Sequence, residues 1–222
     1  MERILIADDH PLFRAALGQA LKTRFAGALV LEASDLPETL ALLAGHPELD
    51  LLLLDLHMPG NRGLAGLVGI RNEFPAVAVV VVSAHEDPRI IRRVLDHGAA
   101  GFIPKSAGMD ELDQAIATIA DCRQWVPERL TAAVAGVASS SEDRELARRM
   151  ASLTPQQFRV LAQVAEGRLN KQIADDLNIQ ERTVKAHMSE IFAKLAVRNR
   201  TQAGIAYRRL ELIDPASRLD ES

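Results

Sequence analysis

The sequence predicts an α/β fold, a doubly wound sheet of five parallel strands, followed by a small all-α domain of four helices. Short apolar runs recur in the first half of the 222-residue chain at 4–7, 29–33, 51–54, 77–82 and 101–103. They are rich in Val, Ile and Leu and hardly alternate with polar residues, which is typical of strands buried on both faces. Helical periodicity lies between these runs, and every periodic segment beyond residue 150 favours a helix.

The five helices of the first half are expected at Pro11–Thr23, Leu36–Ala44, Leu64–Asn72, Pro88–His97 and Met109–Asp121. Pro11 and Pro88 stand at helix starts, where the missing N–H costs little. Asp87 is a suitable N-cap before Pro88. Alternating strands and helices imply a parallel sheet with helices on both faces, and right-handed crossovers make the fold doubly wound.

Residues 122–150 predict a linker that can hold a short helix of its own, because they are first small and polar and then dense in charge. The four helices beyond it are expected at Pro155–Ala165, Asn170–Leu177, Glu181–Leu195 and Thr201–Leu212. Thr154 caps the first of them, and Asn178 suits a left-handed turn. Two helices joined by a tight turn and flanked by two others predict a helix-turn-helix domain. The expected domains are 1–121 and 151–215.

Charge is unevenly distributed along the chain. Residues 1–121 carry 10 Lys and Arg against 17 Asp and Glu, whereas residues 151–215 carry 10 against 7. An acidic front and a basic back suggest two domains with different partners. Cys122 is the single cysteine, which excludes an intrachain disulfide and favours a reducing compartment. Because no apolar run approaches membrane-spanning length, we expect a cytoplasmic protein without a membrane partner.

Polar residues follow four of the five apolar runs. These residues are Asp8 and Asp9, Asp55, Ser83, and Lys105. In a parallel sheet the carboxyl ends of the strands meet at one edge, where ligands bind. Carboxylates are hard oxygen ligands that suit Mg²⁺, and a carboxylate can also attack phosphorus to form an acyl phosphate. The sequence therefore predicts a pocket for a divalent cation and a phosphoryl group, because four such strand ends in order are a poor fit to chance.

This half of the chain resembles the receiver domain of bacterial response regulators, which has a flavodoxin-like fold. The resemblance rests on Asp8-Asp9, on Asp55 with Met58-Pro59-Gly60, on Ser83-Ala84, and on Lys105 in Phe102-Ile103-Pro104-Lys105-Ser106. It implies that a sensor histidine kinase phosphorylates Asp55. It also implies that Asp9, Asp55 and the backbone carbonyl of His57 bind Mg²⁺ directly, with Asp8 assisting through water. Ser83 would move toward the phosphoryl group, followed by a switch aromatic, which is Phe102 in this chain.

Three residues near the expected pocket keep a second interpretation. Phe102 has no hydroxyl, so it either reports the switch by packing or simply fills the core. His57 and His85 each stand two residues after a pocket residue. At these positions the resemblance implies an influence on how fast water removes the phosphoryl group, and our hypothesis is that the two imidazoles shape the approach of that water. The alternative is that both are exposed loop histidines without influence.

The basic second half predicts a surface that binds double-stranded DNA. The segment Glu181–Leu195 places Val184, Met188, Ile191 and Leu195 on one face, so the opposite face suits a recognition helix in the major groove. The residues expected to contact bases or phosphates are Lys171, Arg182, Thr183, Lys185, Ala186, Ser189, Lys194, Arg198 and Arg200. A solvated helix face, or a module that binds protein, would show the same periodicity.

Four motifs decide between these readings, because they resemble the LuxR-type helix-turn-helix of the NarL/FixJ subgroup. They are Leu153-Thr154-Pro155, 170–174, 183–187 and 197–203. Four residues depart from those usual at their positions: Leu169, Asn178, Gln180 and Ala196. Each departure weakens a helix cap or a turn by about 1 kcal/mol. The resemblance implies a homodimer when active, and a two-fold dimer predicts inverted half-sites on the DNA.

The expected function is that of a DNA-binding transcriptional response regulator, activated by Mg²⁺-dependent phosphorylation of Asp55. We expect no enzymatic activity beyond slow autodephosphorylation of its own aspartyl phosphate. A Mg²⁺-dependent phosphatase is one rival, but such enzymes generally need a second acid where this chain has His57. A regulator that never uses phosphorylation is the other rival, although it would normally have lost Asp9, Asp55 or Lys105.

Overall fold

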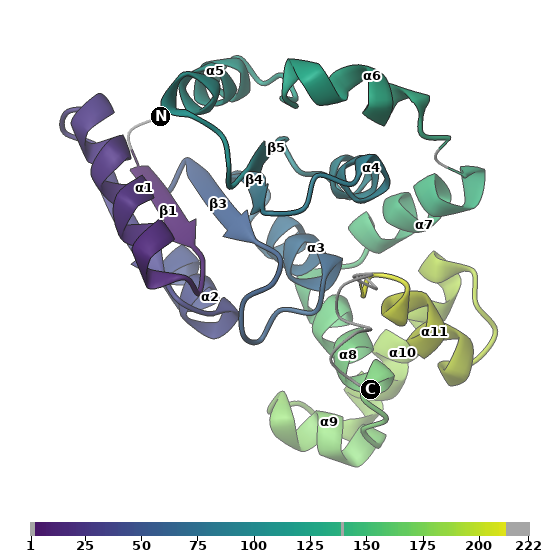
Figure 1. Cartoon of the computed structure of the whole chain (residues 1–222). Coiled ribbons are helices and arrows are strands. Elements are labelled where there is room, and N and C mark those ends of the chain that lie inside the picture. Colours follow the sequence, from purple (N-terminus) through teal and green to yellow (C-terminus); the bar gives the residue numbers. More distant parts are fainter. Residues whose placement is uncertain (1–2, 139, 212–222) are drawn as a thin grey trace, which may run out of the picture. The chain divides into compact units, whose positions relative to one another are not determined.

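The computed structural model describes residues 3–138 and 140–211, and it divides the chain into two compact units. The first unit ends at Ser140 and the second begins at Ser141, so the division falls within the expected linker. Figure 1 shows a sheet with helices on both sides in the first unit and helices in the second.

The first unit contains a five-stranded parallel sheet in the order β2-β1-β3-β4-β5. Its strands are β1 (Arg3–Ala7), β2 (Leu29–Ala33), β3 (Leu51–Asp55), β4 (Ala78–Ser83) and β5 (Gly101–Pro104). Ala7 pairs with Leu54 and Ser83 pairs with Pro104. The residues that follow Ala7 and Pro104 therefore emerge at the same edge of the sheet as the ends of β3 and β4.

The helices of the first unit confirm the predicted fold class, and every predicted boundary falls within one residue of the observed one. They are α1 (Pro11–Arg24), α2 (Leu36–Gly45), α3 (Leu64–Glu73), α4 (Pro88–Asp96) and α5 (Met109–Ala120). The side chain of Asp87 accepts a hydrogen bond from the N–H of Arg89, as its predicted capping role requires. Prolines in the first turn mark the starts of α1, α2 and α4, whereas α3 and α5 begin without a proline or a side-chain cap.

Strands β1, β3, β4 and β5 are buried on both faces, whereas the edge strand β2 is partly exposed. On one face Ile4, Leu51, Val80 and other strand residues form a cluster with buried residues of α1 and α5. The alternate strand residues, such as Leu52 and Val81, are also fully buried. This double burial explains the nearly continuous apolar runs in the sequence.

The expected linker is more structured than the sequence suggested. Instead of one short helix it forms α6 (Glu128–Gly136) in the first unit and α7 (Ser141–Ala151) in the second. Trp125 leads into α6 as an extension of the sheet, since its N–H donates to Ala100 O and its carbonyl accepts from Phe102 N–H, both at 3.0 Å. The linker prediction was therefore incomplete, because the sequence does not show that both of its halves find tertiary partners.

Helix α7 belongs to the second unit by its contacts. Its residue Arg149 donates from Nη1 to the carbonyl of Leu195 at 3.0 Å, at the end of α10. Its residue Asp143 pairs with Arg209 Nη2 at 2.8 Å. The described part of this unit thus contains five helices, one more than the four that the sequence predicted.

The other helices of the second unit are α8 (Pro155–Ala165), α9 (Asn170–Asp176), α10 (Glu181–Leu195) and α11 (Arg200–Arg208). Thr154 and Gln157 form a reciprocal capping box at the start of α8. Asn178 adopts the expected left-handed conformation with φ 51°, and Ala196 does the same with φ 52°. Helix α11 ends before the predicted Leu212, and both that residue and the expected domain end at 215 lie outside the described residues.

Within the described ranges of the chain, none of the helices combines the length and the apolar character needed to cross a membrane.

Candidate functional site

Three carboxylates meet at the carboxyl edge of the sheet, as predicted. Asp8 and Asp9 follow β1, and Asp55 ends β3. Ligand atoms of these residues and of His10 all lie within 4.8 Å of one another. Asp8 and Asp55 are almost fully buried, with exposed fractions of 1% and 2%. The edge of the sheet therefore concentrates negative charge where water screens it poorly.

Lys105 neutralises part of this charge. Its Nζ lies 2.7 Å from Asp55 Oδ2 and 2.7 Å from Asp8 Oδ2. It also lies 5.1 Å from the centre of the Phe13 ring, over the ring face. Burial alone would lower the pKa of Lys105, but the hydrogen bonds with the two carboxylates outweigh burial and raise it. The ammonium group therefore stays charged and lies at the centre of the pocket.

The carboxyl group of Asp55 is held in its ionised form. Burial alone would raise its pKa, but hydrogen bonds from His57 and from Lys105 lower it to about 2. One of these bonds is the backbone N–H of His57 to Asp55 Oδ1, at 3.0 Å. Asp55 is therefore a carboxylate, and so a potential nucleophile, throughout the physiological pH range.

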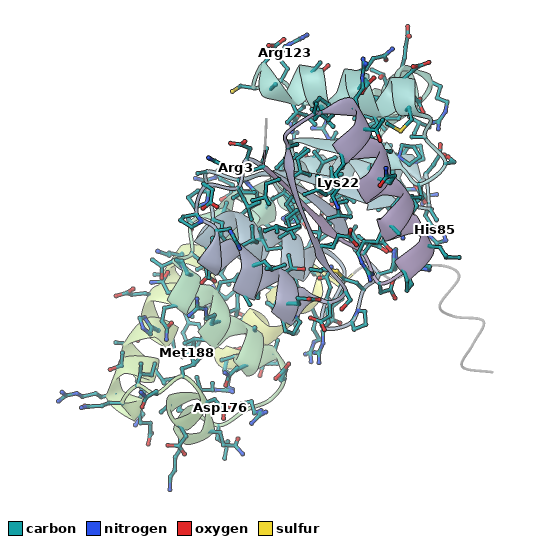
Figure 2. All side chains as sticks on the ribbon, turned by 90° about the vertical axis from the view of Figure 1, so that its left-hand side faces the viewer. Arg3, Lys22, His85, Arg123, Asp176 and Met188 are labelled. Atoms are coloured by element: carbon teal, nitrogen blue, oxygen red, sulfur yellow. The ribbon has the colours of Figure 1, made fainter. Side chains whose placement is uncertain are left out.

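Ser83 and the two histidines line the same edge. The backbone N–H of His85 donates to Ser83 Oγ at 3.2 Å, and the N–H of Lys105 donates to the Ser83 carbonyl at 2.8 Å. The His57 and His85 rings lie 5.7 Å apart, and both side chains are exposed. Figure 2 labels His85 on the first unit. The two rings lie close enough to act together. Their influence on the approach of water therefore stays a hypothesis that concerns both residues.

The donor set fits a hard divalent cation. Asp9 Oδ1 is buried, and no residue that the structure describes gives it a hydrogen bond. The ring nitrogen Nδ1 of His10 lies 2.7 Å from this oxygen. A carboxylate oxygen close to two further carboxylates is the kind of hard oxygen ligand that Mg²⁺ prefers, with water completing its coordination.

Phe102 is fully buried within β5, beside Val81 in the register. Its position agrees with both predicted roles, since a switch aromatic and a core residue are alike in a single conformation. The switch role stays a prediction.

Sequence analysis missed three residues of this edge. His10 joins the carboxylate cluster, and its place directly after Asp9 was the available signal. Arg14 donates from Nη1 to the carbonyl of Asp8 at 2.5 Å. Asn61 donates from Nδ2 to the carbonyl of Leu56 at 3.1 Å. Nothing in the spacing of Arg14 or Asn61 indicates these contacts, because both depend on how loops fold back.

Helix α10 of the second unit buries the face that the sequence predicted. Val184, Met188, Ile191 and Leu195 are buried on one side of α10, and Met188 is labelled in Figure 2. The predicted contact residues with exposed side chains are Lys171, Arg182, Lys185, Ala186, Ser189 and Arg198, whereas Thr183 is half-buried. Lys185 forms a surface ion pair with Glu181 at 2.9 Å, which leaves its ammonium group available at the surface.

Two predicted DNA contacts have structural partners of their own. Lys194 Nζ donates to the carbonyl of Ser152 at 2.8 Å and to Gln157 Oε1 at 2.7 Å. Arg200 donates to Asn170 Oδ1 at 3.1 Å and to the carbonyl of Arg168. Both side chains are half-buried. These hydrogen bonds stabilise the second unit. We therefore expect Lys194 and Arg200 to contribute less to DNA contact than the exposed residues do.

Residues 4–117 match the family described as the response regulator receiver domain, and residues 151–206 match that of the bacterial regulatory proteins of the luxR family. The chain belongs to the response regulator family. It is a DNA-binding transcriptional regulator with a receiver domain and a LuxR-type helix-turn-helix, so the predicted family and function are confirmed. A receiver domain implies a histidine kinase as partner.

Named relatives of this response regulator cover nearly the whole chain. The glycerol metabolism activator of Pseudomonas putida is 44% identical over 206 residues, which cover 91% of this chain and 93% of the relative. The transcriptional regulatory protein LnrK of Bacillus subtilis is 33% identical and covers 92% and 96%. The RcsB response regulator of Salmonella typhimurium is a solved structure with a TM-score of 0.54 and 25% identity over 91% and 97% of the chains. A solved RcsB–DNA complex gives a TM-score of 0.57 at 25% identity, over 95% and 99%.

Proposed function

We propose that this response regulator is switched by phosphorylation of Asp55, with Mg²⁺ as cofactor and a sensor histidine kinase as phosphoryl donor. The observation that carries the proposal is the arrangement of Asp8, Asp9 and Asp55 around the Lys105 ammonium group at the carboxyl edge of the sheet. Asp9, Asp55 and the carbonyl of His57 would hold the metal ion, and Asp8 would assist through water. This is the constellation expected for moving a phosphoryl group onto a carboxylate.

The residues of the pocket divide the chemistry between them. An Asp55 carboxylate oxygen attacks phosphorus and a P–O bond forms, while the P–N bond to the kinase histidine breaks and leaves its electron pair on the ring nitrogen. Bound Mg²⁺ would supply positive charge that reduces repulsion between the carboxylate and the phosphoryl oxygens. Lys105 exchanges its contact with Asp55 for a phosphoryl oxygen, and the Ser83 hydroxyl donates to another.

The output of this switch is DNA binding as a dimer on inverted half-sites. We expect protein treated with acetyl phosphate and Mg²⁺ to bind its DNA about tenfold more tightly than untreated protein, the usual size of an allosteric coupling. DNA selected from a random pool, followed by mobility-shift titration, measures the effect. Asp55→Asn is the control and should show the untreated affinity under both conditions. An equal affinity of phosphorylated and unphosphorylated wild-type protein would favour a regulator that does not use phosphorylation.

We further propose that the signal leaves the receiver through α6. Glu86 lies three residues after Ser83. Its carboxylate accepts hydrogen bonds from Nη1 and Nη2 of Arg129, at 2.8 and 3.2 Å. It also accepts the Ser106 hydroxyl at 3.2 Å. One carboxylate thus joins the loop after Ser83, the residue after Lys105 and the first turn of α6. Ser83 and Lys105 are therefore connected, through the neighbouring Glu86 and Ser106, to α6, which precedes the second unit in the sequence.

Replacing Arg129 with Ala is expected to separate phosphorylation from its output. The tenfold gain in DNA affinity on phosphorylation should fall to about twofold or less, since the coupling energy would be lost. Phosphoryl uptake should stay at the wild-type rate. Arg123→Ala is the control, because Arg123 forms an exposed bridge with its near neighbour Asp121 and is labelled in Figure 2. Partial recovery in the charge-swapped Glu86→Arg, Arg129→Glu variant would identify the ion pair, and an undiminished gain in Arg129→Ala would refute the route.

A further inference from the structure

Asn61 occupies an unusual position between the phosphoacceptor loop and α3. Its Nδ2 donates to the carbonyl of Leu56 at 3.1 Å and approaches the carbonyl of Asp55 at 3.5 Å. Its Oδ1 accepts the backbone N–H of Gly66 at 3.0 Å. One carboxamide therefore uses both of its ends, one on the backbone directly after β3 and the other on the first turn of a helix.

The helix end explains why this contact forms. The N-cap position of α3 is Gly63, which has no side chain to cap the helix. The N–H of Gly66 would otherwise be one of the orphan donors of the first turn. Asn61 supplies the missing acceptor from two residues further back. Its amide is thereby fixed in orientation, so that its NH₂ group points at the loop carbonyls.

Gly66 is shaped to accept this amide. A Cβ atom at Gly66 would lie 2.4 Å from Asn61 Oδ1 and 2.8 Å from its Cγ. Any larger residue would have to push the carboxamide out of its place. Gly costs stability in a helix interior compared with Ala, so the missing methyl group needs a local reason, and the room required by Asn61 provides it.

We propose that Asn61 is a positioning residue for the cation site, and that Gly66 is the second half of the same device. By holding the carbonyls of residues 55 and 56, the amide fixes the turn that contains His57. The N–H of His57 already orients Asp55 Oδ1, and its carbonyl is the proposed metal ligand. Asn61 thus acts on Mg²⁺ affinity through the backbone, in the way that residues behind metal ligands commonly do. This inference rests on the proposed function, because it concerns the same cation site.

The test compares Asn61→Ala with Ile116→Val, a core variant of α5 chosen for a similar fall in Tm. Two quantities are measured on the full-length protein: hydrogen exchange of the 56–63 amides, and the Mg²⁺ concentration that gives half-maximal phosphoryl uptake from acetyl phosphate. Asn61→Ala should speed the exchange and raise the half-maximal Mg²⁺ about tenfold, with a smaller effect on the rate at saturating Mg²⁺. Ile116→Val should leave both near wild type. An unchanged half-maximal Mg²⁺ in Asn61→Ala would overturn the proposal.

A double-variant comparison separates the amide from the space that it needs. Gly66→Ala alone should reproduce the Mg²⁺ defect, because its methyl group displaces the amide. Adding Gly66→Ala to Asn61→Ala should cause no further defect and should raise Tm, since Ala favours the helix once the clash is gone. Additive Mg²⁺ defects would contradict the shared device. If wild-type protein takes up no phosphoryl group, the proposed function fails, whereas unchanged hydrogen exchange in both single variants would sink the positioning role alone.

Discussion

Asp55→Asn is expected to abolish the uptake of a phosphoryl group from acetyl phosphate and Mg²⁺ by this response regulator. Asp55 is nearly fully buried, yet the hydrogen bonds from His57 and Lys105 keep its pKa at about 2. It is therefore the ionised, oriented carboxylate of the pocket, whereas the Asn amide is a poor nucleophile of almost the same shape. Intact mass spectrometry checks this directly, because wild-type protein should gain the mass of one phosphoryl group. A gain that persists in Asp55→Asn would place the phosphoacceptor elsewhere.

Two further measurements sharpen the same expectation. Lys105→Ala should slow uptake about 100-fold, the usual cost of removing one group that stabilises developing negative charge. Lys22→Ala is the matched control, because it removes an exposed lysine of α1, labelled in Figure 2. Chelation of Mg²⁺ should stop uptake in all variants.

The pH dependence follows from the direction of the Asp55 shift. The pKa of Asp55 in the folded protein, about 2, is below its ordinary value of 3.8. Its ionised form therefore stabilises the fold above about pH 4, and this contribution is lost as the pH falls toward 2. Uptake should consequently show no loss from protonation of Asp55 between pH 8 and pH 5. If uptake falls with a midpoint near pH 6 and protonation of Asp55 is the cause, the ion-paired pocket is contradicted.

Lys185→Ala is expected to weaken DNA binding about tenfold or more, within the 1–3 kcal/mol typical of one specific contact. Lys185 is exposed on the surface of α10 opposite its buried face. The ion pair with Glu181 costs little to break when DNA binds, because exposed ion pairs are weak. Titration at several salt concentrations distinguishes its role. A phosphate contact lowers the salt slope by about one, whereas a base contact changes the selected sequence.

Lys194→Ala is the matched comparison for this expectation. The Lys194 ammonium group bonds Ser152 and Gln157 inside the second unit. We expect its removal to lower the Tm of that unit and to leave the salt slope of DNA binding unchanged. A loss of salt slope equal to that of Lys185→Ala would show that Lys194 contacts DNA phosphates after all.

Local signals account for what could be predicted of the fold. Pro11, Asp87 and Thr154 mark helix starts by chemistry that acts over a few residues, and the apolar runs mark buried strands by composition alone. The sequence allowed one short helix within 122–150 but did not assign α7 to the second unit, because its place depends on contacts such as Arg149 with the Leu195 carbonyl. The same limit applies to the DNA surface, since the sequence does not distinguish the surroundings of Lys194 from those of Lys185. Only folding shows that Lys194 bonds Ser152 and Gln157, which lie in a distant segment, whereas Lys185 pairs with Glu181 of its own helix.

The sequence by itself determined the sheet, the family and the polar residues at the strand ends, namely Asp8, Asp9, Asp55, Ser83 and Lys105, because parallel strands bring their carboxyl ends together at one edge. The tertiary structure decided the geometry around them. It showed that Lys105 joins two carboxylates, that Glu86 reaches Arg129, and that one carboxamide at Asn61 fills the space left by Gly66. These contacts depend on side-chain directions and loop paths, which are set by packing between residues that lie far apart in the sequence or fold back across a turn.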